Sequence, residues 1–179
     1  MAGMSFREIG RRLGGSTTLV THYYPTQAAL IRDVATAGVD AWMAVLDVIN
    51  EKYDDPVDRL NAMLFQWLLP ISGEDLANEK TRINLVAAGL QGAETQEALD
   101  IWEDWNKRSL RPILSEFLPA SRVDECADLL RVTFNGLALS TVEHPDYWTP
   151  RRQYKALEAV ARGLGLPATA PKRVSRVAS

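Results

Sequence analysis

The segment STTLVTHYY, residues 16–24, concentrates side chains that could hydrogen-bond to the phosphates or base edges of DNA. If it is helical, its exposed polar residues are Thr17, Thr18, Thr21, His22 and Tyr23. Threonine methyl groups also suit contact with the methyl group of thymine. The preceding arginines, which could contact phosphates without reading sequence, are Arg7, Arg11 and Arg12. Spacing alone leaves an alternative, a capped helical hairpin whose polar face is only solvated.

Two short helices joined by a tight turn are predicted to position these side chains. Ser5 and Glu8 have the spacing of a capping box, which begins the first helix. Gly14-Gly15 permits a turn with positive φ, and Ser16 can cap the second helix. Pro25 ends that second helix. This order of elements is that of a helix-turn-helix.

Every strong periodic signal in the rest of the chain is helical, which predicts an all-α protein. Thr26 should cap a helix about 35–40 Å long, at 1.5 Å per residue, that joins a head to a body. Its expected buried positions are Leu30, Val34, Ala37 or Gly38, Ala41, Val45 and Val48. Further helices are predicted after residue 55, after residue 74, and over 83–92, 95–118, 121–143 and 150–165. Pro112 should kink or divide the helix over 95–118.

The segment 121–143 has two apolar stripes on one helix. One stripe contains Val123, Ala127, Leu130, Phe134, Leu137 and Ala138. The other contains Leu129, Val132, Gly136 and Leu139. A helix that is apolar on two sides needs two packing partners, so 121–143 and 150–165 could bury the second stripe against a second copy of the chain. An ordinary core within one chain is the alternative.

The composition of the 179 residues, 46% hydrophobic and 24% charged, is ordinary for a soluble globular protein. Cys126 is the only cysteine, so an intramolecular disulfide is excluded and a reducing cytoplasm fits best. No apolar run reaches the ~18 residues of a membrane span, so we expect no membrane association. The formal net charge of −3 is divided into +3 over residues 1–32 and −6 over the remainder. A basic head on an acidic body keeps phosphate attraction local.

The sequence gives no sign of a catalytic or metal site. GRRLGGS, residues 10–16, is close to a phosphate-binding loop but lacks its lysine and a preceding strand. We therefore expect no enzyme, no cofactor and no metal. The tryptophans of the body either fill the core or line a pocket between helices. Candidate ligand-binding residues, chosen by residue type and helical phase, are Met63, Gln66, Trp67, Asn84, Trp102, Trp105, Asn106 and Asn135.

The segment SFREIGRRLGGSTTLVTHYYPTQAAL, Ser5 to Leu30, resembles the head of the TetR family of bacterial transcriptional regulators. The rest of the chain agrees with that family only in the order of its helices. The resemblance implies a ligand-responsive repressor that binds a palindromic DNA operator as a homodimer formed by the last two long helices. It also implies that the residues facing DNA are Ser16, Thr17, Thr18, Thr21, His22, Tyr23 and Gln27.

The chain departs from the family pattern in its phosphate contacts and at its start. The family commonly has tyrosine in place of Thr21 and lysine in place of Gln27, so weaker non-specific DNA affinity follows. The family's first helix has no counterpart before Ser5, so we expect a truncated head. The expected units are a partial helix-turn-helix over 1–32, a ligand-binding and dimerisation body over 33–166, and a flexible tail over 167–179. The alternatives are a small-molecule-binding module that has lost DNA binding and, third, a helical-bundle enzyme.

Overall fold

The computed structural model describes residues 6–12, 14–67, 69, 73, 76–77, 79–80, 83–84 and 93–171. Within these ranges every regular element is a helix, which confirms the all-α prediction. The elements are α1 (Phe6–Arg12), α2 (Thr17–Tyr23), α3 (Gln27–Lys52), α4 (Pro56–Ala62), η1 (Met63–Trp67), α6 (Ala93–Leu114), α7 (Ala120–Glu143) and α8 (Pro150–Gly163). The Ser5 cap and most of the segment predicted as helices between 74 and 92 lie outside the described residues. None of the described helices is long and apolar enough to cross a membrane.

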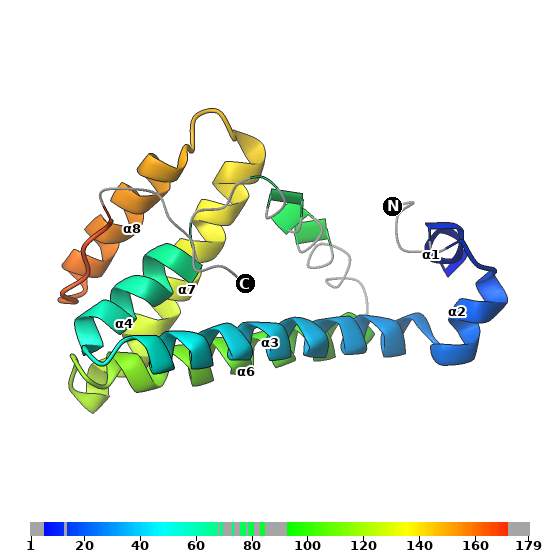
Figure 1. The fold of residues 1–179 in the computed structure, drawn as a ribbon, viewed down its shortest axis with the longest axis horizontal. Coiled ribbons are helices and arrows are strands. Elements are labelled where there is room, and N and C mark those ends of the chain that lie inside the picture. The colour runs from blue at the N-terminus through cyan, green and yellow to red at the C-terminus, as the bar shows by residue number, and fades with distance from the viewer. Residues whose placement is uncertain are drawn as a thin grey trace.

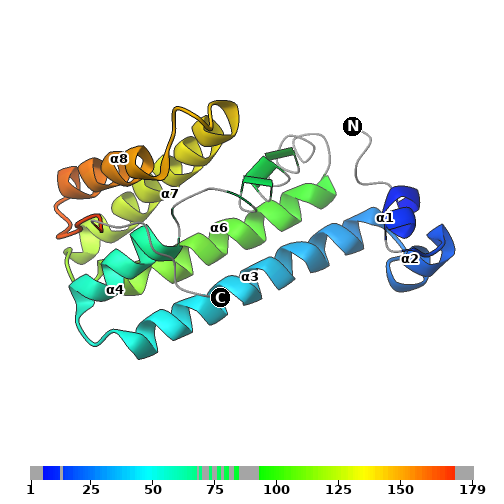
Figure 2. The same cartoon turned by 45° about the horizontal axis from the view of Figure 1, so that its top comes forward.

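The helix α3 sets the length of the molecule. It has 26 residues, which at 1.5 Å per residue make about 39 Å, in agreement with the predicted connector. The Thr26 hydroxyl accepts a hydrogen bond from the backbone N–H of Ala29 at 3.1 Å, so the predicted cap is confirmed. The helices α1 and α2 lie at its N-terminal end, and α6 runs alongside it (Figures 1 and 2). The α4, α7 and α8 helices gather near its other end (Figure 1).

The face that α3 buries differs from the predicted face. Leu30 is buried as expected, but Val34 and Val48 are 50% and 46% exposed. The apolar residues that α3 turns inward over its second half are instead Val39, Trp42, Leu46 and Ile49. The Trp42 ring packs against Trp105 of α6 with 4.6 Å between ring centroids. Because α3 is apolar on two adjacent sides, periodicity could not choose between them, and the side with the large aromatic ring buries more area.

The core lies between α4, η1, α6, α7 and α8. Its fully buried aliphatic residues include Leu60, Leu64, Leu114, Leu130 and Leu157. The ring of Phe65 meets the ring of Tyr154 edge to face, with 5.7 Å between centroids. Gln153 is also completely buried, and its Nε2 donates to the backbone oxygen of Trp148 at 2.8 Å. The burial cost of that amide is therefore offset by a hydrogen bond.

Of two predictions made from prolines, the structure contradicts the division at Pro112 and confirms the helix start at Pro150. The helix α6 runs without a break to Leu114, so the predicted division at Pro112 is wrong. Pro112 lies in the last turn of α6, where its missing N–H removes one backbone hydrogen bond, and the turn after it stays closed by hydrogen bonds such as that from the N–H of Ser115 to the oxygen of Arg111 at 3.0 Å. The helix α8 begins at Pro150 as predicted, but the side chain of Thr149 makes no capping hydrogen bond.

Residues 164–171 form a C-terminal strap that follows α8 and packs back onto the body. Leu166 and Ala168 of this strap are buried in the core. The backbone N–H of Thr169 donates to Oδ1 of Asn61 on α4 at 2.8 Å. Apolar burial and this hydrogen bond together attach the strap to α4.

The expected flexible tail from residue 167 is therefore wrong for residues 167–171. Its prolines, Pro167 and Pro171, suggested a mobile segment, yet Ala168 between them is buried. Amino-acid composition could not predict this order, because the burial of Leu166 and Ala168 and one hydrogen bond from Thr169 to Asn61 decide it. Residues 172–179 lie outside the described part of the chain.

Replacing Asn61 by Ala should release the strap. The Thr169 N–H then loses its protein acceptor, so we expect the free energy of unfolding to fall by about 1 kcal/mol. Urea denaturation would measure that loss, and hydrogen exchange would show faster exchange at residues 166–170. Asn50→Ala is the matched control, because Asn50 is exposed on α3. Equal effects of the two substitutions would contradict the role of the strap contact.

Candidate functional site

Two glycines and a close helix contact build the turn between α1 and α2. Gly14 has a φ of 69°, in the left-handed region that glycine favours. The N–H of Gly15 donates to the oxygen of Gly10 at 2.9 Å. A Cβ atom at Gly10 would lie 2.9 Å from the backbone oxygen of Ser16. The two helices therefore approach each other this closely only because residue 10 is glycine.

The second helix of this pair is capped and oriented by its first and inner residues. The Ser16 hydroxyl accepts a hydrogen bond from the N–H of Leu19 at 3.3 Å, which confirms the predicted cap. Val20 is buried, and Tyr24 is partly buried. Tyr23 is 69% exposed, so Tyr24 and not Tyr23 faces inward. Val20 is the buried residue of α2, and the other residues of that helix are exposed.

Most of the predicted DNA-facing residues lie on α1, on α2 or in the turn between them, at one end of the molecule (Figure 1), and we call their exposed side the head surface. The exposed members of this head surface are Arg7, Arg11, Ser16, Thr17, Thr18, Thr21, His22 and Tyr23. Leu19, which we did not predict, is also exposed among them. The side chains of Arg12 and Gln27 lie outside the described residues.

Contacts within the head surface limit what its side chains can offer a ligand. The Thr21 hydroxyl donates to the backbone oxygen of Thr18 at 3.2 Å. In this conformation Thr21 therefore presents its methyl group and an oxygen acceptor. The rings of His22 and Tyr23 meet edge to face with 5.2 Å between centroids. This contact favours one relative orientation for the two rings.

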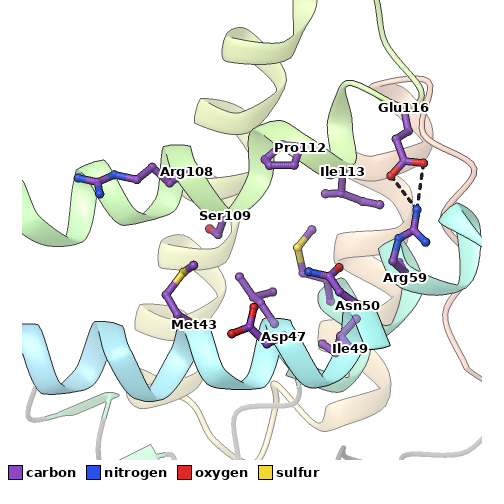
Figure 3. Close-up of a pocket in the computed structure, with 12 residues that line it drawn as sticks. Met43, Asp47, Ile49, Asn50, Arg59, Arg108, Ser109, Pro112, Ile113 and Glu116 are labelled. Carbon is purple, nitrogen blue, oxygen red and sulfur yellow. Dashed lines mark hydrogen bonds and ion pairs between the residues drawn. The ribbon is translucent and has the colours of Figure 1, made fainter. Parts of the chain in front are cut away.

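The predicted ligand-binding residues are distributed over several parts of the body. Met63 and Trp105 are buried, Trp102 and Asn135 are partly buried, and Asn84 is exposed. Gln66 accepts a hydrogen bond from the hydroxyl of Tyr53 at 3.3 Å. The side chains of Trp67 and Asn106 lie outside the described residues. Of the predicted residues with described side chains, Met63 alone lines the cavity shown in Figure 3.

That cavity has a volume of about 150 Å³ and lies between α3, α4, η1 and α6 (Figure 3). Its apolar walls include Leu46, Ile49, Met63 and Ile113. Its polar residues include Asp47, Asn50, Arg59 and Glu116. No local sequence pattern connects these polar residues, because they come from segments about 60 residues apart.

The guanidinium of Arg59 closes one end of the cavity. Its Nη2 donates to both carboxylate oxygens of Glu116 at 2.8 and 3.1 Å (Figure 3). Its Nη1 donates to the backbone oxygens of Tyr53 and Asp54 at 3.1 and 2.8 Å. Arg59 thus holds the turn between α3 and α4 against the end of α6, and its donors on both nitrogens are occupied.

The described part of the body has neither a metal-binding cluster nor an activated thiol. The part of the chain that the structure describes contains no group of three or more His, Cys, Asp or Glu residues that could hold a metal ion. Cys126 is buried on α7, and burial raises the pKa of its thiol. The nucleophilic thiolate is therefore disfavoured at neutral pH.

Substituting Gly10 by Ala should separate α1 from α2, because the added Cβ would meet the Ser16 backbone at 2.9 Å. We expect overpacking of about 1–3 kcal/mol, seen as faster hydrogen exchange over residues 6–24. Gly38→Ala is the control: a Cβ there meets nothing within 4 Å. That substitution should raise helix stability by about 0.5–1 kcal/mol, measured by thermal denaturation. Unchanged exchange in Gly10→Ala would contradict the close helix contact.

Comparison with known proteins gives one informative result. No family model matches this chain, and no curated protein matches it significantly. The crystal structure of a transcriptional regulator from Rhodococcus sp. Rha1 is similar, with 21% sequence identity and a TM-score of 0.76. The match covers 89% of this chain and 84% of that one. The chain therefore has the helical fold of that regulator over most of its length.

Proposed function

We propose that the protein is a DNA-binding transcriptional regulator, similar to the TetR family, that acts as a homodimer. The observation behind the proposal is the head surface, where α2 exposes hydroxyl and imidazole side chains and the adjoining helix α1 exposes Arg7 and Arg11. The fold shared with a transcriptional regulator supports it. The resemblance of residues 5–30 to the TetR head supports it independently of the overall fold.

In this proposal α2 enters the major groove of DNA, as the second helix of a helix-turn-helix does. Thr17, Thr18 and His22 then face base edges or phosphates through hydroxyl and imidazole groups. Arg7 and Arg11 contact phosphates on the flank of the groove, which adds affinity without sequence preference. Ser16, Thr21, Tyr23 and Gln27 complete the proposed interface.

The exposed apolar stripe on α7 supports a dimer. Leu129, Val132 and Leu139 are 43%, 58% and 44% exposed, and Gly136 between them is exposed as well. These four residues recur at spacings of three and four, so they form one continuous stripe along the helix. A second copy of α7 and α8 would cover that stripe. A two-fold axis there would place two heads on the two halves of a palindromic operator.

Ligand response belongs to the same proposal. Residues 1–32 would form the DNA-binding head and residues 33–166 the ligand-binding and dimerisation body, with the unbroken helix α3 joining them. An effector that binds the body and shifts the C-terminal half of α3 would change the separation of the two heads. A repressor of this kind leaves its operator when the effector favours the altered separation.

DNA binding is measured with the full chain and a random library of double-stranded DNA, selected and then titrated by fluorescence anisotropy. We expect selected palindromes and affinity that falls with salt. Arg7→Ala and Arg11→Ala should each remove two phosphate contacts from the dimer, one per subunit, and so lower the slope of log affinity against log salt by about 1.8, whatever the sequence. His22→Ala should relax sequence preference by about 1–3 kcal/mol if it contacts a base.

Lys52→Ala is the control for charge, because Lys52 is an exposed lysine in the last turn of α3, at the opposite end of that helix from α1 and α2 (Figure 1) and outside the proposed dimer interface. It should leave DNA affinity unchanged. Absence of any selected sequence would overturn the regulator proposal and favour a small-molecule-binding protein without DNA activity. A Lys52 variant as weak as the Arg7 variant would show non-specific charge attraction and contradict the proposed interface.

Dimerisation is tested separately by light scattering, with an expected mass of twice the 19.9 kDa of the chain. Val132→Glu would bury a charge without a partner, which costs about 3 kcal/mol or more, and should give a monomer at micromolar concentration. Val48→Glu is the matched control, because Val48 is an exposed valine on α3. A monomeric wild-type protein, or a dimer that survives Val132→Glu, would contradict the proposed interface.

A further inference from the structure

We propose that the cavity between α3, α4, η1 and α6 binds a small organic cation whose apolar part is about the size of benzene. Its regulatory meaning rests on the ligand response proposed above, whereas binding itself requires only the body. Three properties of the cavity lead to this ligand class: its volume, its apolar walls and the carboxylate of Asp47, which has no ion pair with any residue that the structure describes.

Volume and walls define the apolar part of the ligand. A cavity of about 150 Å³ can hold a group of about the size of benzene. Leu46 and Ile49 of α3 and Ile113 of α6 are buried and supply an aliphatic surface. Met63 lies at the buried side and Met43 at the more exposed side. Methionine side chains adapt to ligands of differing shape, so the walls can close around a ring or a short alkyl chain.

The charge of the cavity lining defines the polar part of the ligand. Asp47 and Asn50 line the cavity from α3 (Figure 3). Within the described part of the chain neither side chain has a hydrogen bond or ion pair. An ammonium or amidinium group placed there would gain a charge-assisted hydrogen bond to the Asp47 carboxylate and a further acceptor in the amide oxygen of Asn50.

The two arginines that line the cavity are already compensated. Arg59 uses its donors on Glu116 and on two backbone oxygens, as described above. Arg108 extends away from the cavity along α6 (Figure 3), and its exposed pair with Asp104 at 3.4 Å adds little. An anionic ligand would have to break the Arg59–Glu116 pair and would meet Asp47. The arrangement therefore favours a cation over an anion.

The affinity is expected to be modest. Asp47 is exposed, so water and salt screen its attraction, and a ligand of benzene size offers few atoms for contact. Dissociation constants in the millimolar range are expected for a minimal probe. A natural effector that extends beyond the cavity would bind more tightly with the same cationic group at Asp47.

Benzylammonium is the probe, with benzyl alcohol and benzoate as neutral and anionic analogues of the same ring. The readout is the NMR signal of 13C-labelled methionine methyl groups in the full chain without DNA. The sequence has four methionines, of which Met43 and Met63 line the cavity and Met1 and Met4 lie at the start of the chain. We expect saturable shifts of the Met43 and Met63 signals with benzylammonium, and no shift of the Met1 and Met4 signals.

Benzyl alcohol should bind at least about tenfold more weakly, and benzoate more weakly still, because neither gains the interaction with the carboxylate. Equal affinity for benzyl alcohol and benzylammonium would overturn the cation specificity. Shifts of all four methionine signals, or of none, would overturn the site.

Asp47→Asn keeps the shape of the side chain and removes its charge, so it should weaken benzylammonium binding about five- to tenfold. Asp40→Asn is the matched control: Asp40 is exposed two turns earlier on α3 and does not line the cavity. The affinity of the Asp40→Asn protein for benzylammonium should equal that of the unmodified protein. If Asp40→Asn weakens binding as much as Asp47→Asn, the attraction comes from overall charge and the proposed site is wrong.

The two proposals can fail separately. Benzylammonium binding that depends on Asp47, together with no DNA binding, would overturn the regulator and leave the cation site in place. Sequence-specific DNA binding without shifts of the Met43 and Met63 signals would overturn the cation site and leave the regulator in place.

Discussion

The packing of α3 against α6 is the contact on which the arrangement of the other elements depends. The two helices run side by side in the same direction (Figure 2), and the Trp42 and Trp105 rings fill the space between them. An ion pair between Arg32 and Glu97 at 3.4 Å adds little, because both side chains are more than half exposed. Apolar burial thus holds α3 at its body end, while its first turns extend to α1 and α2.

This arrangement gives the chain two regions with different physical properties. The body has an extensive core in which aliphatic and aromatic residues are almost completely buried. The head rests on two helices of seven residues each and on few buried residues, among them Val20 and Leu30. Local opening costs less free energy where few apolar contacts are lost, so the head should be the less stable region. The head surface, which we propose binds DNA, could therefore adapt its shape to a partner at a low cost in free energy.

Sequence patterns predicted most features that depend on neighbours in the chain. The caps at Ser16 and Thr26, the glycine turn and the length of α3 follow from residues within a few positions. The buried side of α3 could not be predicted, because both sides are apolar and α6 decides between them. The cavity was missed for the same reason: Asp47 and Glu116 lie far apart in sequence, and only tertiary packing brings them to one place.

The C-terminal strap has a consequence for the order in which the fold is completed during synthesis. Its hydrogen bond from Thr169 to Asn61 joins residues 108 positions apart. The part of α4 around Asn61 therefore stays without the strap until 108 further residues have been synthesised. Contacts made late expose apolar surface for longer. Nascent chains that end before residue 168 would lack the buried Ala168 and offer that part of α4 to chaperones.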